Sequence, residues 1–410
     1  MRKGHFTLRD KDVQEQAASL LQKHLRLKDH SPRTTVRVMC HVLFFAAATL
    51  TSIHASCQRL RGAPCDDTMH KALLATLPHF AELQRRINRA LAALLPKMLK
   101  TQKKRQRVRL AIDLTLIPYH GQPQADPKEI YRSKAKDGTS HFHAYASVYI
   151  VLDGERFTVA LTPVEKNEKM EVVTQRLMAL ARKAGIRPKL LLLDRGFYSV
   201  GVIRYLQAAR IPFLMPAIAR GRRPSQDRPA TGIRAFQRWK KGGWGKHTLQ
   251  DGKQRKATVR ICVYCGNYRG QWKRHGRFAW VYAFWGFQPG SVRWVADTYR
   301  LRFGIETSYR QMNEARIRTC SRSPLLRFLF VALALLLRNV WVWLHWEVLS
   351  SPRRGRRLIN LERLRFKTLL FWLLQVAVAT LGALAEKPTE RSNPPSTLAP
   401  SPPTRDVGKY

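Results

Sequence analysis

The spacing of apolar residues changes twice along this chain of 410 residues, and these changes limit the folds that it can adopt. Up to about residue 102, apolar side chains recur every three or four positions, the spacing of an amphipathic helix. The central part alternates apolar and polar residues, as strands do, and helical spacing returns after Gly290. We therefore expect helices at residues 11–25, 34–49, 68–77, 80–99, 292–316 and 325–349.

The central part begins with a strand of strict alternation. Apolar side chains at every second position from Val108 to Leu116 share one face, and Asp113 and Thr115 lie on the other. Further strands are expected at 143–152, 156–163, 189–194 and 211–218, with helices at 169–184 and 199–209. This order predicts an α/β fold in which an antiparallel hairpin sheet is continued by parallel strands.

The charge of the chain points to a polyanionic partner. Lys and Arg number 74 against 27 Asp and Glu, a formal net charge of +47. DNA or RNA is the expected partner, because binding neutralises phosphates and releases their counterions; an anionic membrane surface is the weaker alternative. We expect the helical N-terminal part to bind DNA, with a helix-turn-helix at residues 51–74 or a plain helical bundle as the two possibilities.

A basic segment interrupts the α/β pattern. Residues 219–256 hold twelve Lys or Arg side chains against two acidic ones, and strand-like runs follow at 258–264 and 277–285. We interpret residues 219–290 as a β-rich insertion whose basic loop contacts DNA through Arg220, Arg222, Arg223, Lys240 and Lys241. Its Trp residues could stack on bases, although Trp280 and Trp285 fit a core position better.

The expected domains follow from these patterns. A helical DNA-binding domain at 1–102 precedes an α/β domain at 103–322 that contains the insertion, and C-terminal helices follow at 323–385. Residues 386–410 are rich in Pro, Ser and Thr, which is typical of a disordered tail.

Two features bear on the location of the protein. Residues 368–385 carry no charge over eighteen positions, at the lower edge of a membrane-spanning length, but a buried or dimer-forming helix is the favoured interpretation. The six cysteines form no disulfide framework and fit a reducing cytosol. We expect a cytoplasmic, nucleoid-associated protein.

Three acidic residues stand out in this basic chain: Asp113, Asp194 and Glu306. Asp194 lies at the carboxyl end of an apolar strand, where a side chain reaches an open sheet edge. If the strands of Asp113 and Asp194 are neighbours, their carboxylates converge, and three such groups together require cations. Mg²⁺ suits these oxygen ligands, with Mn²⁺ also possible. Two such ions about 4 Å apart can drive phosphodiester cleavage.

Glu306 belongs to a helix with further candidates. Tyr299, Arg302 and Glu306 follow each other at spacings of three and four, so they share one face, which Arg310 extends. Arg302 can orient Glu306 or clamp a phosphate. The alternative is an ordinary Arg–Glu pair on a solvated helix. Asp297 or Glu314 could replace Glu306 as the third acid if the register differs.

Two weaker patterns remain open. Cys262 and Cys265 have zinc-like spacing, but no second Cys or His pair follows at a suitable distance. Three histidines flank the first two strands, and a satisfied histidine is a safer interpretation than a phosphate or metal role: His120, His141 and His143.

The ordered set of motifs resembles the DDE transposases of bacterial and archaeal insertion sequences. The resemblance covers residues 108–314: an Asp in an early strand, an Asp-Arg-Gly-Phe strand end, an insertion, and Tyr-x2-Arg-x3-Glu on a helix. It implies a ribonuclease-H-like mixed sheet flanked by helices. It also implies that Asp113, Asp194 and Glu306 hold the metal and that Tyr299 and Arg302 contact the transposon end. The subgroup often has a Lys where this chain has Asn313, a contact that Arg310 or Arg316 could replace.

The function that the resemblance implies is metal-dependent cleavage at insertion-sequence ends followed by strand transfer into target DNA. A homodimer is expected in the DNA complex. Two alternatives stay open: a metal-dependent nuclease on the same core without strand transfer, and a DNA-binding derivative that has lost catalysis.

Overall fold

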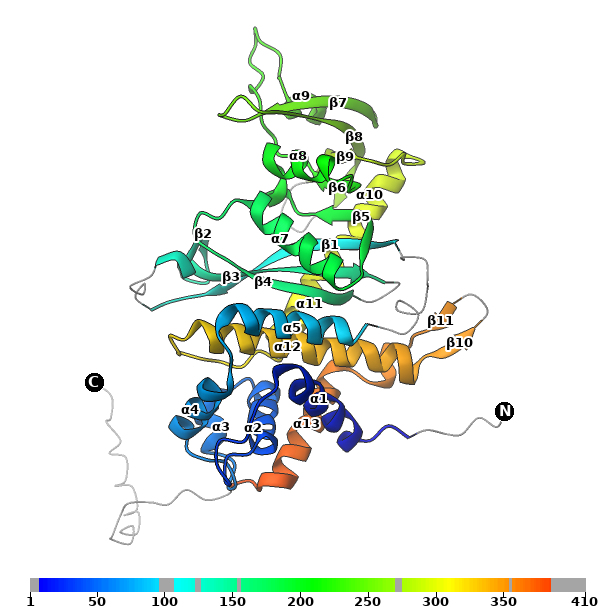
Figure 1. The fold of residues 1–410 in the computed structure, drawn as a ribbon. Helices are drawn as coiled ribbons and strands as arrows, with labels where there is room; N and C mark the ends of the chain where they lie inside the picture. The colour runs from blue at the N-terminus through cyan, green and yellow to red at the C-terminus, as the bar shows by residue number, and fades with distance from the viewer. Residues whose placement is uncertain are drawn as a thin grey trace, which may run out of the picture.

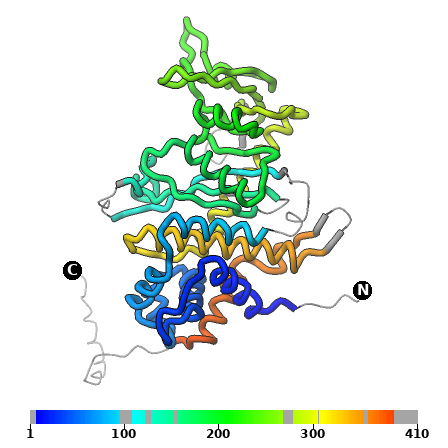
Figure 2. Tube along the Cα trace, viewed as in Figure 1, coloured from blue at the N-terminus to red at the C-terminus, as the bar shows by residue number. Residues whose placement is uncertain are grey.

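A computed structural model describes the protein at residues 7–95, 107–121, 127–152, 156–269, 275–353 and 356–384. Figure 1 shows an elongated molecule in which a helical base lies beneath two helices that run side by side across the molecule, α5 (Phe80–Ala93) and α12 (Pro324–Leu344). A central sheet lies above them, and a β-rich tip completes the other end. The tube in Figure 2 shows that the base combines the beginning and the end of the described chain. The tail at 386–410 lies outside the described residues.

The N-terminal helices follow the apolar spacing closely. They are α1 (Asp10–Leu25), α2 (Val36–Thr49), α3 (Ile53–Cys57), α4 (Asp66–Thr76) and α5 (Phe80–Ala93). Side-chain caps set two of the starts, since Thr35 accepts from the Val38 amide and Ser52 from the Ala55 amide. The expected continuation of α5 to residue 99 reaches beyond the described residues.

The short α3 packs against α4, the arrangement that the helix-turn-helix hypothesis needs. However, α4 begins with Asp66 and Asp67. Recognition helices usually present their N-terminal residues to base edges, and two acidic side chains there disfavour that contact. A plain helical bundle therefore describes this part of the base better.

The C-terminal helices complete the base. Helix α12 (Pro324–Leu344) continues as a π-helical turn, η4 (His345–Leu349), and packs against α5 and the sheet. Helix α13 (Phe366–Leu381) packs against α1 and α2. A short hairpin of β10 (Ser351–Arg353) and β11 (Arg356–Leu358), followed by the 3-10 turn η5 (Leu361–Arg363), joins the two helices.

Two segments among the described residues are long and apolar enough to cross a membrane. In the Pro324–Leu349 segment, 94% of the apolar window is buried inside the protein, whereas the figure is 44% for Leu361–Leu381. Burial explains the composition of the first segment, because α12 is the central helix between the base and the sheet (Figure 1).

The central sheet is mixed, as the sequence predicts. Its main strands are β1 (Arg107–Pro118), β3 (Thr139–Val151), β4 (Arg156–Val164), β5 (Arg187–Leu193) and β6 (Phe213–Pro216). β1 pairs with β3 antiparallel and with β5 parallel, and β6 continues the parallel part. The crossover helices are α7 (Met170–Lys183) and α8 (Val200–Ala208). The sequence interpretation missed β2 (Tyr131–Lys136), which lies in an expected loop after the 3-10 turn η1 (Pro127–Glu129).

The insertion extends this sheet instead of forming a separate one. It contains α9 (Ile233–Gln237), β7 (Gly243–Gln250), β8 (Lys256–Arg269) and β9 (His275–Trp285). β9 pairs with β6, so the strand order is β2-β3-β1-β5-β6-β9-β8-β7, with β4 also on β3. The sequence interpretation expected a basic loop up to residue 256, and this part of it is wrong, because β7 forms a strand within that stretch. Its alternating exposed and half-buried positions carry Lys246 and His247 among small residues, which hides the strand pattern.

Two asparagine side chains bind the outer edge of β4. Asn339 of α12 accepts from the Thr158 amide at 3.0 Å and donates to the Thr158 carbonyl at 2.7 Å. Asn88 of α5 does the same at Leu161, at 2.8 and 3.0 Å. A β-bulge between these positions, where β3 and β4 shift register, turns both backbone pairs outward. The edge strand β4 is thereby hydrogen-bonded to both α5 and α12.

Candidate active site

Asp113 and Asp194 lie at one place because their strands are parallel neighbours. Ile112 of β1 is paired with Leu193 of β5, and the residues that follow these two in the chain are Asp113 and Asp194. Asp194 lies just beyond the end of β5 and caps the short 3-10 turn η2 (Arg195–Phe197), accepting from the Gly196 amide. Both carboxylates thus emerge near the carboxyl end of β5, as the strand order predicts.

Glu306 comes from a helical segment that is broken where a single helix was expected. The expected helix at 292–316 consists of α10 (Val292–Arg300), a 3-10 turn η3 (Leu301–Phe303) and α11 (Gly304–Asn313). The Arg156 guanidinium donates to the Leu301 carbonyl at 2.6 Å and so holds the turn. Tyr299, Arg302 and Glu306 lie one on each of these three pieces, and they still face each other across the turn.

Arg302 joins the three acidic residues. Its Nη1 lies 3.0 Å from Asp113 Oδ2, and its Nη2 lies 3.5 Å from Asp194 Oδ1 and 3.6 Å from Glu306 Oε1. The Arg302 side chain is only 6% exposed, against 15% for Asp113 and 62% for Glu306. One buried guanidinium therefore contacts three carboxylates, from the middle of β1, the end of β5 and a helix.

Burial and charge oppose each other at this site. Burial raises the pKa of Asp113 to about 6, although the charge of Arg302 and the Leu114 amide act to lower it. Burial acts to lower the pKa of Arg302, but Tyr299, Asp113 and Asp194 together raise it. The guanidinium is thus charged, and the Asp113 carboxylate is held in an environment that disfavours its ionised form.

Aromatic side chains fix Arg302 and the strand beneath it. Arg302 Nε donates to the Tyr299 hydroxyl at 2.9 Å, and its guanidinium lies over the Tyr299 and Phe303 rings. The Tyr309 hydroxyl donates to the Asp113 carbonyl at 2.8 Å and lies 2.6 Å from Ser147 Oγ. Sequence reasoning missed Tyr309 and Arg156. Tyr309 lies seven residues after Arg302, a spacing that places both on one helical face and could have drawn attention to it.

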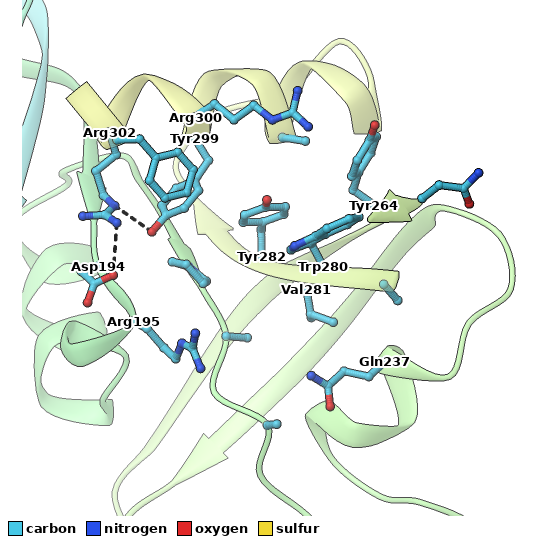
Figure 3. Close-up of a pocket in the computed structure, with 17 residues that line it drawn as sticks. Asp194, Arg195, Gln237, Tyr264, Trp280, Val281, Tyr282, Tyr299, Arg300 and Arg302 are labelled. Carbon is cyan, nitrogen blue, oxygen red and sulfur yellow. Dashed lines mark hydrogen bonds and ion pairs between the residues drawn. The ribbon is translucent and has the colours of Figure 1, made fainter. Parts of the chain in front are cut away.

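A cavity of about 520 Å³ opens beside the acidic residues. Asp194, Tyr299 and Arg302 line one end of it, and the insertion contributes much of the remaining wall. Figure 3 shows the rings of Tyr264, Trp280 and Tyr282 along its wall, with Arg195, Arg300 and Gln237 around it. Asn267 also lines it. The insertion thus places stacking surfaces and amide groups next to the three carboxylates.

The other sequence-predicted residues lie away from this centre. Arg310 is exposed on α11. The basic residues of the insertion are all exposed on the segment that leads to and from α9, near the far rim of the cavity where Ala219 and Gln237 line it: Arg220, Arg222, Arg223, Lys240 and Lys241. Tyr299, in contrast, is 4% exposed, so its hydroxyl serves Arg302 and not the solvent.

The structure separates Glu306 from the alternative third acids. Asp297 pairs with Arg300 at 3.3 Å and Arg293 at 3.6 Å on the surface of α10. Glu314 is the C-terminal cap of α11. The Arg302 contacts are to Glu306, which makes it the acid that belongs with Asp113 and Asp194.

The residues fit a divalent metal by their chemistry. Three carboxylates supply the hard oxygen donors that Mg²⁺ and Mn²⁺ prefer. Across the described ranges, no three His, Cys, Asp or Glu side chains are already arranged as a metal site; the carboxylates surround the guanidinium instead. The zinc-like pair does not form a site either, since Cys262 is buried with its pKa raised to about 12 by burial, and Cys265 contacts the Trp239 carbonyl.

The family model described as "Transposase DDE domain" matches residues 104–340, more than half of the chain. The chain belongs to this family of DDE transposases. The match spans β1, the insertion, Glu306 and most of α12.

A solved structure shows the same fold. It is a cryo-EM structure of a piggyBac transposase synaptic complex with hairpin DNA, and it aligns with 93% of this chain and 82% of that chain at a TM-score of 0.50 and 10% identity. At this identity the likeness concerns the fold alone. It confirms the expected class, a mixed α/β sheet flanked by helices that is consistent with the ribonuclease-H-like fold of transposases. No curated protein matches the chain at a significant level.

Proposed function

We propose that this DDE transposase cleaves DNA at the ends of an insertion sequence, with divalent metal ions as cofactor. The freed 3′-hydroxyl then attacks a phosphodiester of target DNA, which joins the end to the target and releases a 3′-hydroxyl of the target strand. The observation that carries the proposal is the contact of one guanidinium, Arg302, with Asp113, Asp194 and Glu306. Three carboxylates around one buried cation form a centre of concentrated negative charge in a strongly basic protein. Clustered carboxylates of this kind can bind metal ions that act on a phosphodiester.

Each residue has a role in this proposal. Asp113, Asp194 and Glu306 hold Mg²⁺ or Mn²⁺, which when bound would activate the attacking oxygen and stabilise the leaving one. Arg302 positions the carboxylates and presents a planar fork that matches a phosphate. Tyr299 and Phe303 keep the guanidinium in place, and Tyr309 holds β1 against α11.

The insertion would hold the DNA beside this centre. The exposed Arg and Lys side chains around α9 supply phosphate contacts. The aromatic cavity offers Tyr264, Trp280 and Tyr282 for stacking and Gln237 for hydrogen bonds, which are the groups that bind a base taken out of the duplex. Cutting and joining at both ends of an element requires two active sites, so we include a homodimer in the DNA complex in the proposal.

The test is cleavage of the cognate end, whose sequence the inverted repeats flanking the gene would supply. We expect Mg²⁺-dependent cleavage by the wild type and a loss of at least 100-fold in Asp194→Asn, because one metal ligand is lost. Asp297→Asn is the matched control, since Asp297 pairs only with surface arginines among its described contacts, and it should cleave normally. Equal cleavage by wild type and Asp194→Asn would refute the proposal.

A second assay separates the transposase from a nuclease on the same core. Pre-cut ends that carry a free 3′-hydroxyl are incubated with plasmid DNA and a divalent metal. Joined products support strand transfer, whereas cleavage of intact ends without joining of pre-cut ones would favour the nuclease.

A further inference from the structure

A second cavity, of about 380 Å³, lies where the central sheet meets the helical base. Ile117 and Pro118 at the end of β1 line it from the sheet, the segment after α11 forms another wall, and Ser52 lines it from the base. The basic side chains in its lining are three arginines and two histidines: Arg316, Arg318, Arg327, His120 and His143. None of the described residues that line this cavity is acidic.

Arg327 is built into the cavity wall. It is 8% exposed, and its Nε donates to the Ser321 carbonyl at 2.6 Å. Its guanidinium contacts the His143 ring and lies over the Tyr119 ring at 5.3 Å. Arg316 is oriented by its own contact, since its Nε donates to Asn313 Oδ1 at 3.3 Å. Hydrogen bonds therefore orient two of the three arginines, Arg316 and Arg327, in the cavity wall.

The cavity carries more positive charge than its surroundings neutralise. Burial, together with the charge of Arg318, lowers the pKa of Arg316 to about 10. Burial and then the charge of Arg327 lower the pKa of His143 to about 4. Glu129 is the nearby acid, and it lines the neighbouring cavity on the other side of Arg327 and His143. An anion in the cavity would relieve the repulsion between these groups.

The cavity also lies at a useful distance from the three carboxylates. Ile117 is four residues beyond Asp113 on the same face of β1, which is about 13 Å at the rise of a strand. Helix α11 runs from Glu306 to Asn313, and Arg316 follows it. At about 3.4 Å of rise per nucleotide, this separation corresponds to roughly four nucleotides of DNA.

We propose that this cavity binds a backbone phosphate of the DNA strand whose scissile bond lies at Asp113, Asp194 and Glu306. The inference rests on the proposed function and adds a second point that sets the register of the DNA. The Asn313 side chain accepts a hydrogen bond from Arg316 and so orients this arginine, which lines the cavity.

The first test is the salt dependence of binding to a 30-base-pair duplex. The double variant Arg316→Gln and Arg318→Gln removes two of the cations. We expect the slope of log Kobs against log salt to become shallower by about one, since the single phosphate contact that is lost contributes about 0.9. The matched control is Arg182→Gln with Arg187→Gln, two exposed arginines at the opposite end of β5 from Asp194. Its slope should change by less than about half that amount.

A second test uses the exposed thiol in the cavity wall, Cys320. In a Cys65→Ser background, which removes the other exposed thiol among the described residues, a cognate-end duplex carries a thiol tether on one backbone phosphate at a time. We expect disulfide formation to peak for a tether roughly four nucleotides from the cleavage site, and to vanish in Cys320→Ser.

The outcomes separate this inference from the proposed function. If the wild type neither binds nor cleaves the end, the proposed function fails. If it does both, but the arginine variant changes the slope no more than the control and no tether position reacts with Cys320, the phosphate site alone is refuted. Thermal unfolding of both double variants shows whether they fold; a misfolded arginine variant leaves the Cys320 experiment to decide.

Discussion

Replacing Arg302 by Gln should destabilise the protein mainly by removing the partner of the Asp113 carboxylate. The Asp194 and Glu306 side chains are 42% and 62% exposed, so water screens their pairs with Arg302 and each contributes at most about 1 kcal/mol. Asp113 is 15% exposed and 3.0 Å from the guanidinium. Breaking a buried pair costs about 3–5 kcal/mol, but Asp113 can take up a proton instead of remaining charged. We therefore expect a loss of about 3 kcal/mol near neutral pH.

Urea unfolding monitored by circular dichroism measures this loss. Arg300→Gln is the control, because Arg300 has the same side chain on the same segment but is 61% exposed, and its effect should stay within about 0.5 kcal/mol. Adding Asp113→Asn to Arg302→Gln should restore most of the stability, since the unpaired carboxylate is gone. Mn²⁺ should also stabilise Arg302→Gln more than the wild type. Equal stability of the two Arg variants, or no coupling between positions 302 and 113, would refute this reasoning.

Three other changes address separate parts of the molecule. The pKa of Asp113 rises from 3.8 to about 6 on folding, so its ionisation lowers wild-type stability by up to about 3 kcal/mol as pH rises through that interval. Asp113→Asn removes this titration, and thermal melts at pH 4 and 7.5 should show a smaller loss of stability with rising pH in the variant than in the wild type. Asn339→Leu leaves the Thr158 amide and carbonyl unpaired and should cost about 2–4 kcal/mol in urea unfolding, whereas Gln375→Leu on the exposed side of α13 should cost little. The exposed basic side chains around α9 in the insertion are Arg220, Arg222, Arg223, Lys240 and Lys241. Replacing them by Glu should make the slope of log Kobs against log salt shallower by about one unit for each phosphate that is no longer neutralised. An unchanged slope would exclude the insertion from the DNA interface.

The strands and two of the acids could be predicted because local pattern determines them. Alternation fixes which side of β1 bears Asp113, and the sequence places Asp194 at a strand end, but that β1 and β5 are parallel neighbours is seen only in the structure. Once Ile112 pairs with Leu193, Asp113 and Asp194 have to emerge together. Glu306 could be singled out because spacings of three and four survive a tight helical turn.

The rest depends on contacts that no local pattern records. The break between α10 and α11 is held by Arg156, 145 positions away from Leu301 in sequence. The pairing of β9 with β6, which joins the insertion to the sheet, brings together strands separated by the whole basic segment. The contact of Arg302 with all three acids likewise requires the strands and the helix to be assembled first.

The asparagines on β4 have a mechanical consequence. The side-chain amide of each asparagine is hydrogen-bonded to one backbone residue of β4 through both its oxygen and its nitrogen. Neither α5 nor α12 can therefore slide along the sheet without breaking two hydrogen bonds at once. Shear between the base and the sheet is therefore blocked. The edge is also closed to any foreign strand. We therefore expect any movement of the insertion relative to the base to occur beyond β6, where the pairing of β6 with β9 is the strand ladder that joins the described part of the insertion to the sheet.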